Sequence, residues 1–281
     1  MNALELRNVT KKYPDFCLEG IDLTLPGGCI IGLIGQNGAG KSTTIKLILD
    51  MLQLDEGYIS VLGMDHHKHA RDIKEDVGVV LDEVGIPECL NARQVGKVMQ
   101  NTYKNWDMAK YNELLLRLSL PEKKPFKEFS RGMKMKLGIA VAMSHGAKLL
   151  VLDEPTGGLD PVVRDQVVEM FYEFTRDEEH SILISSHIVS DLERLCDYVA
   201  FLHHGKLLLC QEKDALLDTY CGVRCTREQL ATLPAGAILH KRETPYGVEL
   251  VMKREDVPQE LARGPITIEE LFVTMIKEAR A

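Results

Sequence analysis

Eight consecutive residues have the types and the spacing of a phosphate-binding loop. Residues 35–42 match the pattern G-x-x-x-x-G-K-[ST] and lie between an apolar run, 29–34, and a helical pattern, 42–52. Glycines let backbone N–H groups curl around phosphate oxygens, and the start of a helix adds partial positive charge. The pattern predicts that Lys41 reaches the β- and γ-phosphates of a nucleotide and that the Ser42 hydroxyl binds Mg²⁺. The alternative is a glycine-rich turn with a chance Lys-Ser pair. The expected nucleotide contacts are Gly35, Gln36, Asn37, Gly38, Ala39, Gly40, Lys41, Ser42 and Thr43.

A second apolar run ends in two carboxylates. Residues 148–152 are followed by Asp153 and Glu154. Because the carboxyl ends of parallel strands meet at one edge of a sheet, we expect Asp153 to face the same site as residues 35–42. Asp153 would contact Mg²⁺ directly or through water, and Glu154 would polarise the attacking water. The alternative is that this pair only caps the following helix.

The elements that must position these residues alternate between buried strands and helices. The runs 29–34, 148–152, 181–186 and 198–202 are apolar enough for strands buried on both faces. Helical patterns lie between them, which predicts an α/β fold with a mostly parallel sheet. The first thirty-odd residues predict additional strands with period-two burial.

Two stretches interrupt the alternation. Residues 84–145 predict an inserted helical lobe, with helices near 94–103, 110–118 and 132–144. After residue 217 the chain predicts a small α+β appendage with turns near 232–236 and 244–247, a strand over 248–252 and a helix over 268–279. The expected domains are therefore 1–215 and 216–281.

Composition narrows the classes of function. The 281 residues carry a formal net charge of −8, which argues against a general nucleic-acid partner. Seven scattered cysteines without a CxxC pair predict reduced thiols. We see neither a signal-peptide pattern nor a run of about 18 apolar residues. The sequence thus predicts a cytoplasmic protein whose membrane role, if any, requires a partner.

A third motif suggests a family. Phe129-Ser130-Arg131-Gly132-Met133, whose serine precedes Asp153 by 23 residues, resembles the L-S-G-G-Q signature motif of ABC ATPases, in a variant familiar from bacterial drug and peptide exporters. In that family the serine and second glycine of one subunit close over the γ-phosphate held by the other. Ser130 would begin a helix whose N-terminal amides form an anion seat. The alternative is that Ser130 is only a helix cap.

The resemblance covers residues of about 3 to 215 and implies further contacts. Tyr13 stands where an aromatic residue stacks on adenine, although it could be an ordinary turn tyrosine. Gly158 and Asp160 resemble the loop that crosses a dimer interface, although Asp160 could only cap a helix opened by Pro161. His187 resembles the histidine that contacts the γ-phosphate, although such residues are often plain core or surface histidines.

One position departs from the family pattern. The loop that joins the catalytic and helical lobes normally begins with Gln, and counting from residues 77–78 places Asp82 there. A carboxylate would sense Mg²⁺ and the attacking water differently from an amide. Asp82 therefore joins Ser42 and Asp153 in the predicted metal set.

The resemblance implies a P-loop NTPase of the ABC ATPase type. Its fold would combine a RecA-like mixed sheet, an antiparallel β subdomain and the helical insertion, and residues 268–272 resemble a closing helix of the exporter branch. The implied function is an ATP-hydrolysing motor with ATP and Mg²⁺ as cofactors. It would act as a homodimer, or with a paired motor subunit, on a separate polytopic membrane permease, at the inner face of the membrane.

Export of drugs, amphipathic peptides or lipids is the expected direction. The alternatives are an importer motor, an ABC protein of translation or DNA repair, and a P-loop kinase. Two histidine-rich segments predict no site: 66–69 reads as a solvated loop and 203–206 as a tight turn between strands.

Overall fold

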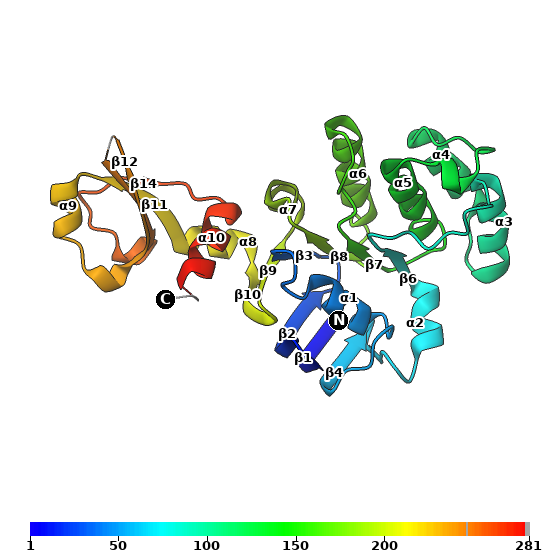
Figure 1. Ribbon diagram of the computed structural model, residues 1–281, viewed down its shortest axis with the longest axis horizontal. Helices are drawn as coiled ribbons and strands as arrows, with labels where there is room; N and C mark the ends of the chain where they lie inside the picture. The colour runs from blue at the N-terminus through cyan, green and yellow to red at the C-terminus, as the bar shows by residue number, and fades with distance from the viewer. Residues whose placement is uncertain (246, 279–281) are drawn as a thin grey trace.

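The central sheet of the computed structural model, which describes residues 1–245 and 247–278, has six strands in the order β10-β9-β3-β8-β7-β6 (Figure 1). Its strands are β3 (Ile30–Gly35), β6 (Val77–Val80), β7 (Leu149–Asp153), β8 (Ser181–Ser186), β9 (Tyr198–His203) and β10 (Lys206–Glu212). All are parallel to their neighbours except β10, which pairs antiparallel with β9. The predicted α/β class with a mixed sheet is confirmed.

Alternate residues of this sheet belong to two separate hydrophobic clusters. Leu150 and Leu152 of β7 pack into the larger cluster, whereas Leu149 and Val151 pack into the second. Successive strand side chains point to opposite faces, so a strand with both faces covered must be apolar throughout. Helices α1 (Lys41–Ile48) and α7 (Val189–Leu195) contact strands of this sheet, and α6 (Pro161–Phe174) packs on α7.

Helix α1 is shorter than the predicted span of 42–52. It ends at Ile48 because Asp50 takes a left-handed conformation, with φ of 52°, and the chain turns. Met51 N donates to Lys46 O and Asp50 N to Leu47 O, which is the hydrogen-bond pattern of a Schellman motif. Aspartate is a less common residue than glycine for this turn, so the helix end had no clear signal in the sequence.

An antiparallel sheet covers one side of the central sheet, as predicted. Its order is β2-β1-β4-β5, from β1 (Asn2–Tyr13), β2 (Phe16–Pro26), β4 (Glu56–Val61) and β5 (Met64–Asp65). Its apolar side chains share the second cluster with β3 and β7. A helix, α2 (Ala70–Asp76), then leads into β6.

The inserted lobe is helical, as predicted. It contains α3 (Ala92–Thr102), α4 (Met108–Arg117), a 3₁₀ turn (Phe126–Glu128) and α5 (Arg131–Ala142). Side chains cap all three α-helices, from Asn91, Asp107 and Ser130. The lobe rests on the core where α5 crosses β6: a Cβ added to Gly78 would lie 2.5 Å from Ala142 O.

The predicted appendage forms a third sheet at the opposite end of the molecule from the helical lobe (Figure 1). Its order is β12-β13-β11-β14, and it has its own cluster of buried residues. The elements here are α8 (Lys213–Thr219), β11 (Tyr220–Cys225), α9 (Arg227–Ala231), two 3₁₀ turns (Ala235–Ala237 and Arg254–Asp256), β12 (Ile238–Thr244), β13 (Gly247–Lys253) and β14 (Arg263–Gly264). Residue 246 of the predicted turn lies outside the described residues.

The last described helix, α10 (Ile268–Glu278), belongs to the main core. Ile268 and Leu271 join the larger cluster, and the rings of Phe272 and Phe201 of β9 lie 5.2 Å apart. Residue 279, the end of the predicted helix, lies outside the described part. The division at residues 215 and 216 remains a prediction, because Leu216 also packs into the larger cluster. No helix in residues 1–245 or 247–278 is both long enough and apolar enough to cross a membrane.

Candidate nucleotide site

Three adjacent strands bring the predicted chemistry to one edge of the central sheet. β3 leads into the lysine loop (residues 35–42), β7 ends at Asp153, and β8 is followed by His187; β8 lies between the other two and pairs in parallel with both. The parallel pairing of these strands therefore assembles residues that are more than 100 positions apart.

The lysine loop presents an open surface above the first turn of α1. Gln36, Asn37 and Gly38 are exposed, and so is Ser42, while Thr43 is half-buried. Gly40 precedes the helix with φ of 113°, a conformation that L side chains rarely adopt. Backbone amides of a glycine-containing loop and the start of a helix both suit an anion. Two residues of the loop are instead part of its support: Gly35 and Ala39 are buried.

Lys41 is the buried cation of the site, with 6% of its surface exposed. Its Nζ donates to Gly35 O at 2.8 Å and lies 3.3 Å from Glu154 Oε1. The ammonium group is thus held between the loop backbone and a carboxylate, within the site rather than in solvent.

Asp153 is buried and oriented by a neighbour that the sequence analysis missed. Ser185 Oγ donates to Asp153 Oδ1 at 2.5 Å. The same hydroxyl accepts from Glu154 N at 3.1 Å. The only signal for Ser185 was a small polar residue at the end of an apolar strand, two positions before His187.

Glu154 is held on several sides. Its Oε2 accepts from His187 N at 3.2 Å and lies 2.6 Å from His187 Nδ1. Its backbone takes a left-handed conformation with φ of 52°, which is unusual for a residue other than glycine. The capping alternative for Asp153-Glu154 is wrong, because the residue that caps the following helix α6 is Asp160.

The signature segment lies at the start of α5. Ser130 is the N-cap, with its Oγ accepting from Met133 N at 3.2 Å. The helix cap that the alternative invoked is therefore present, but it leaves the signature role in place, because a hydroxyl that accepts this bond still has a proton to donate. Ser130 and Arg131 are exposed, whereas Gly132 and Met133 are half-buried, with Met133 packed against the core.

The loop of Gly158 and Asp160 lies beside this helix start. A Cβ added to Gly132 would lie 3.5 Å from Gly158 O. Asp160 caps α6 by accepting from Val163 N at 3.1 Å, as the alternative required. Gly158 has φ of 75°, and both residues are exposed.

Tyr13 is exposed at the end of β1, with its ring 6.4 Å from that of Phe16. Phe16 in turn reaches the lysine loop: a Cβ on Gly40 would lie 3.0 Å from Phe16 Cζ. The ring of Tyr13 is thus one residue removed from the loop. Phe16 was not singled out in the sequence, because nothing local to it indicates the contact with Gly40.

Asp82 stands two residues beyond the end of β6. Its Oδ1 lies 2.5 Å from Arg131 Nη2, and both side chains are largely exposed. The structure thus connects the position that departs from the family pattern with the signature segment.

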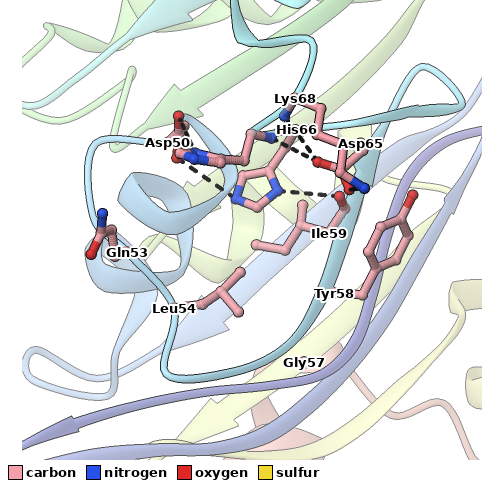
Figure 2. A pocket seen from close by; sticks show the side chains of 10 residues that line it. Asp50, Gln53, Leu54, Gly57, Tyr58, Ile59, Asp65, His66 and Lys68 are labelled. Atoms are coloured by element: carbon pink, nitrogen blue, oxygen red, sulfur yellow. Dashed lines mark hydrogen bonds and ion pairs between the residues drawn. The ribbon is translucent and has the colours of Figure 1, made fainter.

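A pocket outside this site corrects one expectation (Figure 2). It has a volume of about 330 Å³ and is lined by Asp50, Tyr58, His66 and neighbours. His66 is buried, with Nδ1 3.2 Å from Ile59 O, so it is not part of a solvated loop; burial lowers its pKa. His67 is exposed, as predicted, and lies 3.0 Å from Asp50. Among residues 1–245 and 247–278, His66 and His67 are in no metal-sized cluster of three.

A lysine loop at a parallel strand end, a neighbouring Asp-Glu step and a serine-headed helix define a nucleotide-hydrolysing P-loop protein. The family model described as ABC transporter matches residues 18–157. ABC transporter ATP-binding protein YtrB of Bacillus subtilis (strain 168) is 29% identical over 96% of this chain and 97% of its own. Lantibiotic transport ATP-binding protein SrtF of Streptococcus pyogenes is 36% identical over 75% of this chain and 91% of its own.

Solved structures agree with the sequence relatives. One, described as the structure of an ATP binding subunit of an ABC transporter, is 27% identical and covers 82% of this chain and 93% of its own, with a TM-score of 0.70. The chain belongs to the ATP-binding proteins of ABC transporters. It is an ATP hydrolase and the motor subunit of a transporter, and such subunits pair with a membrane permease. The kinase alternative is wrong.

Proposed function

We propose that this motor hydrolyses ATP at a composite site, with the phosphates on the lysine loop of one copy and Ser130–Met133 of a second copy closing over them. The contacts of Glu154 are the observation that carries the hydrolytic part of the proposal. They place a carboxylate between Lys41 and His187, at the edge where the lysine loop opens.

Within one protomer the residues have distinct roles. The amides of residues 36–42 and Lys41 bind the triphosphate, and Tyr13 stacks on the adenine. Glu154 orients the attacking water, and His187 contacts the γ-phosphate while it steadies Glu154. The strained backbone of Glu154 fits such a role, since residues in sparsely populated conformations cluster at active sites.

The residues fit a magnesium ion beside the phosphates. Asp153 offers a buried carboxylate oriented by Ser185, and Ser42 offers an exposed hydroxyl at the start of α1. Hard oxygen donors of this kind are the ligands Mg²⁺ prefers. Ser42 and Asp153, with Asp82 at the same sheet edge, would hold the ion, which supplies charge neutralisation for the transferred phosphoryl group.

The second copy completes the site. Ser130 and Arg131 are exposed at a helix N-terminus, and the loop of Gly158 and Asp160 is exposed beside them. A homodimer with two-fold symmetry would place each helix start on the partner's ATP. ATP would stabilise the closed dimer because it binds both faces.

The motor works at the inner face of the membrane, through the permease, and its direction is export. The export assignment rests on the relationship to SrtF, whose name describes lantibiotic transport. The importer reading predicts the opposite movement. In vesicles with the motor on the outside, ATP should drive an amphipathic peptide into the lumen if the transporter exports.

Substitution of Glu154 by Gln tests the composite site. We expect hydrolysis to fall by about 10²- to 10³-fold, as for loss of one catalytic group, while MgATP produces a stable dimer. Light scattering and phosphate release measure the two effects. Glu169→Gln, which removes an exposed carboxylate from α6, should change neither. A normal rate of hydrolysis by Glu154→Gln would contradict the catalytic role of Glu154. A protein that stays monomeric with MgATP would contradict the proposed dimer.

A further inference from the structure

Arg131 connects three segments that are distant in the sequence. Its Nη2 lies 2.5 Å from Asp82 Oδ1. Its aliphatic part lies beside Gly158, since a Cβ there would be 3.6 Å from Arg131 Cδ. One side chain therefore bridges the end of β6, the start of α5 and the loop before α6.

These contacts join two of the positions at which the chain departs from the family pattern. The signature pattern has glycine where this chain has Arg131, and the lobe-joining loop has glutamine where this chain has Asp82. The first change adds a guanidinium, a group suited to phosphate. The second adds a carboxylate, a group suited to Mg²⁺. In the structure, the two added charges neutralise each other.

The two charges have separate duties in the proposed function. β6 and β7 are parallel and their last pair is Val80 with Leu152, so Asp82 and Glu154 each follow that pair by two residues, at the same edge of the sheet. Arg131, next to Ser130, would instead face the ATP held by the second copy. While the ion pair is closed, Asp82 is not fully available to the site of its own protomer, and Arg131 is not fully available to the ATP of the second copy.

We infer that the Asp82–Arg131 ion pair is a latch that MgATP bound in the same protomer opens, and that its opening frees Arg131 for the γ-phosphate of the second copy. The inference rests on the proposed function. Side-chain exposures of 50% and 65% make the pair a surface ion pair, which is weak enough to exchange for a divalent cation. Arg131 thereby acts on its own protomer's site as a positioning residue, through Asp82.

The test measures nucleotide affinity in a protein that cannot turn over. In the full-length Glu154→Gln protein, at nanomolar concentrations where light scattering confirms monomers, a fluorescent ATP analogue is titrated with Mg²⁺ or with EDTA. Arg131→Gln, Asp82→Asn and the double variant complete a thermodynamic cycle.

The latch predicts an effect that needs both the carboxylate and the metal. Arg131→Gln should tighten MgATP binding about two- to fivefold, which corresponds to about 0.4–1 kcal/mol. It should leave affinity in EDTA unchanged, and it should have no effect once Asp82→Asn is present. If Arg131 had only a structural role, the effect of Arg131→Gln on ATP affinity would not depend on Mg²⁺.

A comparable ion pair in the same lobe provides the control. Arg93 Nη2 lies 3.1 Å from Glu122 Oε2, with exposures of 62% and 46%. Arg93→Gln should leave MgATP affinity unchanged, and thermal unfolding should show that every variant is folded.

Three results would overturn the latch. It fails if Arg131→Gln has the same effect with Asn at position 82, if the effect persists in EDTA, or if there is no effect with Mg²⁺. In each of these cases, the proposed nucleotide site is retained as long as the Glu154→Gln protein binds ATP in a Mg²⁺-dependent way. If that protein binds no MgATP at all, the proposed function and the latch fall together.

Discussion

The two halves of the proposed composite site differ in how far one chain completes them. At the lysine loop, the charged groups contact each other: Lys41 and His187 both contact Glu154, and Ser185 donates to Asp153. At the start of α5, Ser130 and Arg131 face outward, and the hydroxyl of Ser130 has a proton left to donate. The first half is organised before a ligand arrives, and the second is arranged for something outside the protomer.

The largest expected effect concerns the outward half of the site, which is the start of α5. There, one substitution can separate catalysis from folding. Ser130→Asn keeps a good helix cap, because Asn accepts the same bond, but it replaces the hydroxyl by a bulkier amide. We expect ATP hydrolysis to fall by about 10²- to 10³-fold, while ATP affinity of the monomer changes less than about twofold. Phosphate release and nucleotide titration measure these. If the ATP affinity of the monomer fell as much as the rate of hydrolysis, Ser130 would act on the nucleotide of its own chain.

The inner half should respond in the opposite way. Lys41→Ala removes a charge-assisted bond to phosphate worth about 1.5–3 kcal/mol, so the affinity of the monomer itself should fall by about 10- to 100-fold. Titration of a fluorescent ATP analogue checks this at concentrations too low for dimers. Lys46→Ala, which removes an exposed lysine from the same helix, is the control. Unchanged affinity in Lys41→Ala would contradict the assignment of the phosphate site.

The support of the outward half can be weakened on its own. Gly78→Ala would place a Cβ 2.5 Å from Ala142 O, where α5 rests on β6. Overpacking of this kind costs about 1–3 kcal/mol, so the melting temperature should fall by about 2 to 10 °C. Gly85→Ala, with nothing within 4 Å of the added Cβ, should be neutral. A neutral Gly78→Ala would show that the lobe shifts freely against the sheet.

The smallest expected effect concerns pH at the same junction. His145 is buried three residues after the end of α5, with its Nε2 3.3 Å from Val77 O, and burial lowers its pKa. A lowered pKa means that the unfolded chain binds the proton first as pH falls. Stability is therefore present above the unfolded pKa and is lost as the pH falls below about 6.5. His145→Asn should make the melting temperature fall less between pH 7.5 and 5.5. An unchanged slope would mean that other groups cause the loss of stability at low pH.

Local patterns carried most of the prediction. Residues 35–42 and 149–154 could be placed at one edge of a parallel sheet because each strand is apolar on both faces and ends in its own polar group. What the pattern did not contain was contact between distant segments. Ser185 beneath Asp153, Phe16 against Gly40 and the pairing of Asp82 with Arg131 each need the folded chain. The end of α1 at Ile48 depended on a turn at Asp50 that carries no glycine signal.

The docking of α10 has a consequence for how the protein is made. Phe272 covers Phe201 of β9, the strand beside β3, so the main core is completed by a helix that leaves the ribosome after the entire third sheet. Until then, the motor has an uncovered apolar flank next to the strand that carries its phosphate loop. The nascent protein should therefore depend on chaperones during that interval, and ribosome-bound chains stalled before residue 268 should be cleaved by protease more readily than chains released whole.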